Sequence, residues 1–113
     1  MQYDKFCTEV VQKRRVFTFT EDGELLVYPV HGNEVVPFWS SQARLEKIAL
    51  AHPKYAKFEL SEYSHTQFEQ YLCQLESEGI LVGVNWSGAR LVGYNVPVND
   101  LRASMSTRAA SAV

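Results

Sequence analysis

The stretch LVGVNWSGARLVGYNV, residues 81–96, decides how the C-terminal part of this chain folds. It contains the motif Leu-Val-Gly-x-Asn twice, ten residues apart, on either side of a Ser-Gly-Ala centre. In both copies large apolar residues alternate with small or polar ones, which is typical of a strand with one buried face. Serine and glycine between two such runs favour a turn. The stretch therefore predicts a β-hairpin made of two similar strands.

The register of this hairpin depends on the length of its loop, because side chains alternate between the two faces of a strand. A three-residue loop, Ser87-Gly88-Ala89, pairs Val82 with Tyr94 and gathers nearly all large apolar side chains on one face. A two-residue turn at Ser87-Gly88 would instead bring glycine and asparagine beneath the core. We therefore predict the three-residue loop.

The same register brings Gly83 opposite Gly93 on the face away from the core. Two facing glycines leave a gap in a sheet, and each costs about 0.5–1 kcal/mol relative to alanine. Two kinds of explanation remain open. The first is structural: a helix of the same chain packs into the gap, or the strands bend sharply there. The second is functional: the gap is a contact window for a partner subunit or ligand, flanked by the amides of Asn85 and Asn95.

Three further strands are predicted in the N-terminal part of the chain, from β-rich segments separated by glycine turns. Gly23 and Gly32 mark the turns. The strands cover residues 16–20, 25–30 and 34–39. Together they predict a three-stranded antiparallel meander, in which Pro37 indicates a sheet edge or a bulge because proline has no backbone N–H to donate.

Helices are predicted where apolar residues recur every three or four positions. They cover residues 2–13, 41–52 and 65–78. Ser40 or Ser41 caps the second helix, Ser64 caps the third, and Gly79 supplies a left-handed residue at the end of the third. The loosely alternating segment 55–63 predicts an additional strand.

We expect these elements to form one α+β domain over residues 1–105. Its antiparallel sheet combines the N-terminal meander with the C-terminal hairpin, and the three helices lie mainly on one face. Asn99 or Asp100 opens a short helical turn, and the small, polar residues 106–113 predict a flexible C-terminal tail.

Composition and charge narrow the class of protein. Among 113 residues, 46% are hydrophobic and 21% are charged, which is typical of a globular domain. The net charge of −2 lacks the positive excess that nucleic-acid binding requires. The sequence has neither a signal-peptide pattern nor an apolar run of about 18 residues. We therefore expect a cytoplasmic protein that binds neither nucleic acid nor membranes.

Residues with reactive side chains do not form a recognisable catalytic or metal-binding pattern. Cys7 falls on the apolar face of its predicted helix and Cys73 beside such a face, so we expect two free thiols, of which only Cys73 is accessible. His31, His52 and His65 lack the spacing of metal ligands. We predict no catalytic residue, no metal and no cofactor, and the sequence does not point to an enzyme.

Three segments resemble a known family: VVPFWSS leading into a helix, a helix ending in LESEGI, and VGVNWSG near the end of the domain. The chain is similar to the bacterial family catalogued as domain of unknown function 2750, from Tyr3 to Leu101. The most specific blocks are Phe38-Trp39-Ser40 and Gly83-Val84-Asn85-Trp86. The resemblance implies a small cytosolic bacterial α+β protein. No catalytic residue can be carried over, because that family has no established activity.

The two tryptophans indicate where a partner could bind, because each ends a predicted strand beside a serine, a position that suits an interface or a core margin. With the glycine window, they predict a non-enzymatic protein-interaction module that binds a second copy of itself or another protein, as inhibitor and immunity proteins do. The alternative is a small-molecule-binding or sensor domain with a pocket near Trp39, Asn85, Trp86 and Arg90. The candidate binding residues are Trp39, Gly83, Asn85, Trp86, Arg90, Gly93 and Asn95. A concave pocket would favour the small molecule, and a flat apolar patch would favour the protein partner.

Overall fold

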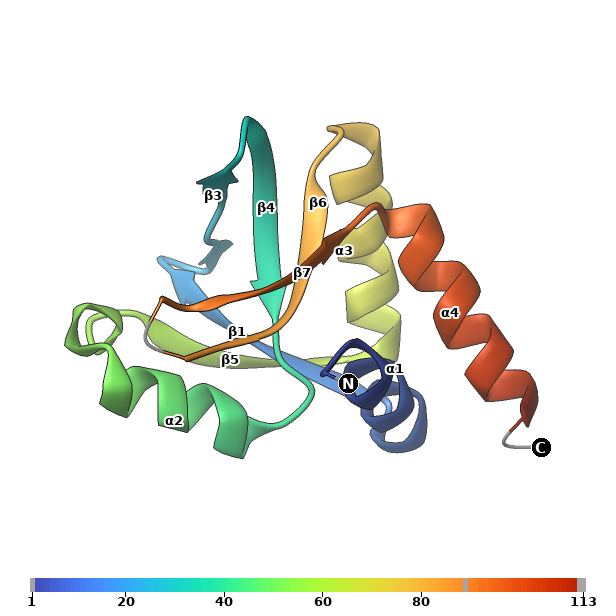
Figure 1. Cartoon of the computed structure of the whole chain (residues 1–113), viewed down its shortest axis with the longest axis horizontal. Helices are drawn as coiled ribbons and strands as arrows, with labels where there is room; N and C mark the ends of the chain where they lie inside the picture. The colour runs from blue at the N-terminus through green and yellow to red at the C-terminus, as the bar shows by residue number, and fades with distance from the viewer. Residues whose placement is uncertain (1, 89, 112–113) are drawn as a thin grey trace.

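Seven strands form two sheets, not one, over residues 2–88 and 90–111, the part of the chain that this computed structural model describes (Figure 1). The first sheet is antiparallel and has the order β2-β1-β5, with strands Glu24–Leu25, Arg15–Glu21 and Glu59–Ser64. The second sheet has the order β3-β4-β6-β7, with strands Tyr28–Val30, Asn33–Phe38, Leu81–Ser87 and Val92–Val96. It is mixed, because β4 and β6 run parallel. The predicted α+β class is confirmed, whereas the predicted single antiparallel sheet is wrong.

The predicted N-terminal meander is divided between the two sheets. β1 pairs with β2 only at Thr20–Leu25 and Glu21–Glu24, and it pairs along most of its length with β5. The chain then leaves this ladder, and β3 pairs with β4 in the second sheet. The sequence could not reveal this division, because the alternation of side chains along a strand is the same whichever strand lies beside it.

The two glycine turns of this region are confirmed. Asp22 and Gly23 have φ of 52° and 79°, and His31 and Gly32 have φ of 49° and 83°. Positive φ at both central residues is the conformation that two-residue hairpins favour, because its twist matches that of the flanking strands.

Pro37 lies in an internal strand, not at the sheet edge that its type indicates. β4 lies between β3 and β6, and Pro37 is paired with Gly83 of β6. The proline is tolerated because β3 extends only to Tyr28, which is paired with Val35. On the β3 side, Pro37 therefore lies beyond the hydrogen-bonded ladder.

The three predicted helices are present, together with a fourth. The α-helices of the described residues are α1 (Gln2–Lys13), α2 (Gln42–Ala51), α3 (His65–Ser77) and α4 (Val98–Ser111), and a 3-10 turn, η1, covers Pro53–Tyr55. Ser41 caps α2, Ser64 and Gln67 form a capping box at α3, and Gly79 has a φ of 70° after that helix. The strand predicted over 55–63 is present as β5, but it begins only at Glu59, because Tyr55 belongs to η1.

Buried side chains form two cores on opposite faces of the second sheet. The first core contains Phe6, Cys7, Val10, Val16, Val36, Phe38, Phe68, Leu72, Leu75, Ile80, Val82, Val84, Val98, Leu101 and Met105. The second core contains Phe17, Phe19, Val35, Trp39, Leu45, Ile48, Tyr55 and Trp86. Because Val35 and Val36 are consecutive in β4, they point to opposite faces.

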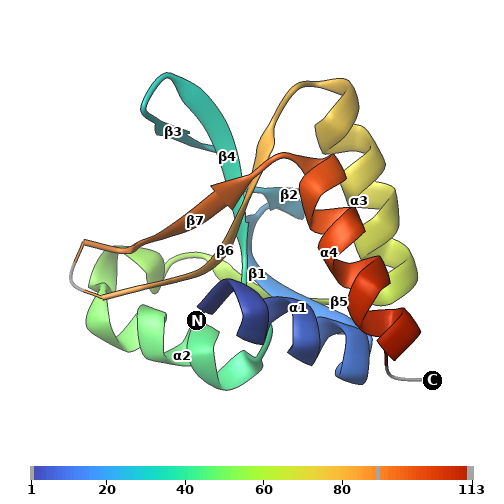
Figure 2. The same ribbon diagram turned by 45° about the vertical axis from the view of Figure 1, so that its right-hand side comes forward.

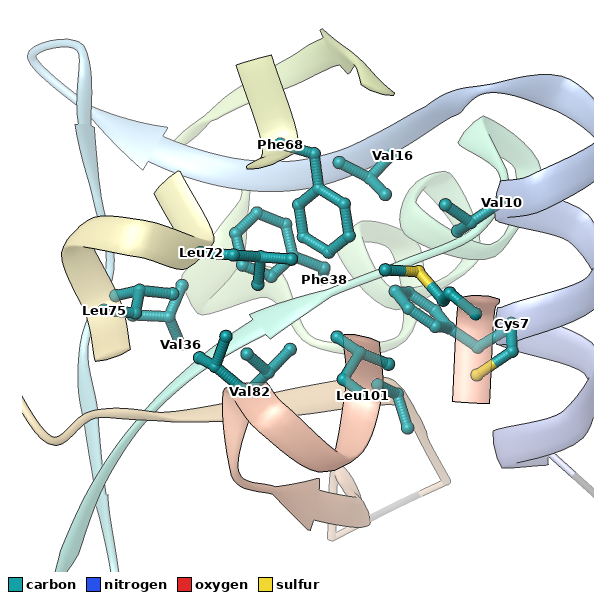
Figure 3. Packing of buried hydrophobic residues seen from close by; sticks show 14 of the residues in the cluster. Cys7, Val10, Val16, Val36, Phe38, Phe68, Leu72, Leu75, Val82 and Leu101 are labelled. Atoms are coloured by element: carbon teal, nitrogen blue, oxygen red, sulfur yellow. The ribbon is translucent and has the colours of Figure 1, made fainter. Parts of the chain in front are cut away.

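Each core has its own helices. Figure 3 shows residues of α1, α3 and α4 converging on β4 in the first core, where the rings of Phe38 and Phe68 lie 4.9 Å apart. The second core is covered by α2 and η1, which lie away from α3 and α4 in Figure 1. Among the described residues, α1, α3 and α4 therefore share one face of the second sheet, and α2 covers the other. Two of the three predicted helices lie on the same face, and the helix predicted over 41–52 does not.

Helix α4 replaces the short helical turn that the sequence predicted. It packs against α1 and α3 (Figure 2) and buries three apolar residues one or two turns apart, Val98, Leu101 and Met105. The hydroxyl of Tyr3 donates to Ser104 Oγ over 2.7 Å. Residues 106–111 of the predicted tail are helical, and residues 112–113 lie outside the described residues. The flexibility of the tail stays a prediction.

The register of the β6–β7 hairpin differs from the prediction by two residues. Val82 pairs with Val96 and Val84 with Tyr94, so Gly83 lies opposite Asn95 and not opposite Gly93. A shift of two keeps Val82, Val84, Tyr94 and Val96 on their predicted face. The loop, however, now covers residues 88–91, of which Ala89 lies outside the described residues. The predicted three-residue loop is wrong.

The longer loop and a β-bulge together set this register. Between the pairs Val84–Tyr94 and Ser87–Val92, β6 contains one more residue than β7. Asn85 in this segment has a φ of 47°. A bulge residue interrupts the alternation of a strand. Val84 consequently lies in the first core, whereas Trp86 lies in the second core on the opposite face.

The burial of α4 predicts that it contributes strongly to stability. Leu101→Ala should lower the free energy of unfolding by about 2–5 kcal/mol, because it leaves a cavity in the first core. Leu50→Ala is the matched control: Leu50 is 85% exposed, so its truncation should change stability by less than about 0.5 kcal/mol. Urea unfolding followed by circular dichroism measures both, and equal effects of the two substitutions would contradict the packing of α4.

Candidate functional site

The indole of Trp86 fills the gap that the glycines leave in the hairpin. A Cβ atom placed on Gly83 would lie 2.5 Å from Trp86 Nε1, and one placed on Gly93 would lie 2.8 Å from Trp86 Cδ1. Both positions therefore have to be glycine for the ring to lie there. Trp86 Nε1 also donates a hydrogen bond of 2.8 Å to Asn95 Oδ1. The occupant of the gap is thus neither a helix nor a partner but a side chain of the hairpin itself.

Asn85 is held in its left-handed conformation by Ser40. Asn85 Oδ1 accepts from the backbone N–H of Ser40 over 2.9 Å, and Asn85 Nδ2 donates to Ser40 Oγ over 3.1 Å. The Ser40 hydroxyl in turn donates to Glu9 Oε1 over 2.7 Å. Asn85 and Ser40 are buried, and buried polar groups are costly unless they are paired. This network therefore fixes the bulge to the end of β4 and to α1.

Trp39 joins the two sheets at the same place. Its backbone exchanges hydrogen bonds of 2.8 and 2.7 Å with Phe17 of β1, and its indole Nε1 donates to the carbonyl oxygen of Trp86 over 2.8 Å. Both tryptophans are almost completely buried. The structure thus brings together Trp39, Asn85 and Trp86, three of the residues named in the sequence hypothesis of a small-molecule pocket.

A cleft of about 680 Å³ opens beside these residues, between α2 and the bulged end of β6; we call it the α2 cleft. Its wall from α2 and the residue after it consists of Arg44, Lys47, Ile48, Ala51 and His52. The opposite wall consists of Gln2, Trp39, Asn85, Trp86, Ser87 and Gly88. The volume lies within the range of about 300–1,000 Å³ that is usual for small-molecule sites.

The end of the α2 cleft is closed by a contact between its two walls. His52 Nε2 lies 3.0 Å from the carbonyl oxygen of Gly88. Because a carbonyl oxygen only accepts hydrogen bonds, Nε2 carries the proton in this contact. His52 therefore connects the end of α2 to the loop of the hairpin and fixes the width of the cleft there.

Arg44 is held at the other end of the α2 cleft. Its Nη1 donates to Gln2 Oε1 over 3.0 Å, and its Nη2 lies 3.3 Å from Glu9 Oε1. The same carboxylate accepts from Ser40. The guanidinium group is therefore oriented by the network that also fixes the bulge.

The remaining candidate residues lie outside the α2 cleft. Arg90, Gly93 and Asn95 line a separate concavity of about 320 Å³ beside the turn between β3 and β4. Gly83 lies against the Trp86 ring. Of the four residues named for the predicted pocket, Trp39, Asn85 and Trp86 line the α2 cleft, and Arg90 does not.

The sequence prediction missed the basic residues of the α2 cleft. Arg44, Lys47 and Ala51 recur at i, i+3 and i+7, so they lie on one helix face. That spacing was readable from the sequence. What could not be read was which surface the polar face of α2 approaches, because this depends on the tertiary fold.

Both predictions about the cysteines are confirmed. Cys7 and Cys73 are free; Cys7 is buried and Cys73 is exposed. Burial raises the pKa of the Cys7 thiol above its ordinary value. Cys73 Sγ accepts from Arg102 Nη2 over 3.1 Å. Cys7 is therefore a core residue and not a reactive thiol.

These features define a small α+β protein in which a helix and a bulged hairpin enclose a cleft. The chain belongs to the family described as protein of unknown function (DUF2750), whose model matches residues 3–105, so the resemblance seen in the sequence is confirmed. A comparison with curated proteins gave no match. Among the described helices, none has the length and apolar character needed to cross a membrane.

Proposed function

We propose that this protein binds a small molecule in the α2 cleft. The observation that carries the proposal is the cleft itself, a concave site whose lining includes Trp39, Asn85 and Trp86. Ile48 and Ala51 add apolar lining on the side of α2. A concave site with a few fixed polar groups is typical of small-molecule binding, whereas a protein partner generally requires a flatter surface.

The rigidity of the α2 cleft supports the same proposal. Asn85 is fixed by Ser40, Trp86 by Asn95, and His52 by the carbonyl of Gly88. A ligand that enters a site already in its binding geometry does not have to order the side chains around it, which favours affinity. A cytoplasmic and bacterial origin stays a prediction, as does the lack of nucleic-acid and membrane partners.

Two related dyes test the proposal: N-phenyl-1-naphthylamine and 8-anilino-1-naphthalenesulfonate, whose fluorescence increases in apolar sites. We expect saturable binding of at least one dye at one site per chain. Ala51→Trp should abolish it, because a large ring on the α2 wall occupies the cleft. Ala103→Trp is the matched control on the exposed side of α4 and should leave binding unchanged. Binding that both variants retain would contradict the proposal.

A second candidate function is self-association through β7. β7 ends the second sheet, and among the described residues no strand pairs with its outer edge. It carries no charged residue, and Val92 and Tyr94 are 62% and 47% exposed. Exposed sheet edges usually carry charges that prevent pairing with another chain.

Light scattering tests this second candidate. If β7 pairs with a second copy, the wild-type protein is dimeric and Tyr94→Lys is monomeric, because a charged side chain at the edge opposes strand pairing. Leu60→Lys, at an exposed apolar residue of β5, is the control and should remain dimeric. A monomeric wild-type protein at concentrations of about 100 μM would exclude a dimer of micromolar affinity.

A further inference from the structure

The charges around the α2 cleft are of one sign. Arg44 and Lys47 lie on the same wall, and none of the cleft residues in the described part of the chain is an aspartate or a glutamate. This contrasts with the chain as a whole, whose net charge is −2. A cleft with basic groups and no acidic group attracts anions, because its walls concentrate the positive potential.

Glu9 reduces this positive charge without cancelling it. Its carboxylate accepts from Ser40 Oγ over 2.7 Å and lies 3.3 Å from Arg44 Nη2 and 3.9 Å from Lys13 Nζ. Glu9 is thus shared among three groups and is not itself part of the cleft wall. Lys47 has no ion pair with another of the described residues.

The basic residues retain donors for a ligand. A guanidinium group has five N–H donors, and Arg44 directs its Nη1 to Gln2 and its Nη2 to Glu9. Lys47 is exposed at the cleft and offers the three donors of its ammonium group. Hydrogen bonds between such cations and a carboxylate, sulfonate or phosphate are stronger than those between neutral groups.

We infer that the ligand of the α2 cleft is an organic anion, with an apolar body against Ile48, Ala51 and Trp86 and an acidic group beside Arg44 and Lys47. This inference rests on the proposed function, since it names the class of molecule that the same cleft binds. The apolar body accounts for the aliphatic and aromatic lining, and the acidic group accounts for the excess of positive charge.

The two naphthylamine dyes test the inference, because they share one ring system and only 8-anilino-1-naphthalenesulfonate carries an acidic group. Lys47→Gln should weaken binding of the sulfonate dye about two- to fivefold and leave the neutral dye unchanged, since it removes one partly solvated charge interaction. Lys5→Gln, on the exposed side of α1 and outside the cleft, is the matched control and should affect neither dye. Raising the salt concentration should weaken only the sulfonate dye.

The outcomes separate this inference from the proposed function. If both dyes bind in a manner that Ala51→Trp abolishes, but Lys47→Gln and salt affect them equally or not at all, the cleft is a ligand site and the preference for anions is wrong. If Ala51→Trp changes the binding of neither dye, the proposed function itself is wrong, and the inference fails with it. If Ala51→Trp abolishes dye binding, and Lys47→Gln weakens binding of the sulfonate dye but not of the neutral dye, both the proposed function and the inference are supported.

Discussion

The left-handed backbone of Asn85 is the constraint on which the rest of the site depends. One extra residue in β6 reverses the alternation of the strand, so that Val84 lies in the first core and Trp86 in the second. Asparagine is one of the few residues other than glycine that adopt positive φ at modest cost. Ser40 stabilises this conformation through hydrogen bonds to both Oδ1 and Nδ2 of the Asn85 side chain. The bulge is therefore stabilised by specific hydrogen bonds and determines on which face Trp86 lies.

The position of Trp86 explains the repeated glycine motif and the formation of the cleft. Gly83 and Gly93 both leave room for the same indole ring. The glycines of the repeated Leu-Val-Gly-x-Asn motif are therefore explained by the packing of Trp86, and not by a symmetric pair of strands. The carbonyl group of Trp86 accepts from Trp39, whose backbone is bonded to β1 in the first sheet. One bulge thus connects the two sheets and fixes one wall of the α2 cleft. The ligand preference that we infer follows from the other wall, where α2 supplies basic residues.

Local sequence signals predicted the features that depend on local physics. The helices over 2–13, 41–52 and 65–78, the serine caps of the second and third helix, and the positive-φ turns follow from periodicity and hydrogen bonding within a few residues. Partner strands and register could not be predicted, because alternation is compatible with many partners and one bulge changes the register. The length of α4 was underestimated because alanine and serine separate its few large apolar residues, so the helical periodicity is weak. Of the residues that line the α2 cleft, Trp39, Asn85 and Trp86 were candidates because of their types, whereas Arg44 and Lys47 gain significance only from the tertiary fold.

A double-mutant cycle between Gly83 and Trp86 tests the central claim, that the bulge places the indole over the glycines. Gly83→Ala alone should lower the free energy of unfolding by about 1–3 kcal/mol, because its Cβ overlaps the ring. In a Trp86→Leu background the same change should cost almost nothing, because leucine lacks the ring atoms that the Cβ would meet within 2.8 Å: Nε1, Cε2 and Cζ2. Urea unfolding of the four proteins gives the coupling free energy directly. An equal cost of Gly83→Ala in both backgrounds would contradict the account.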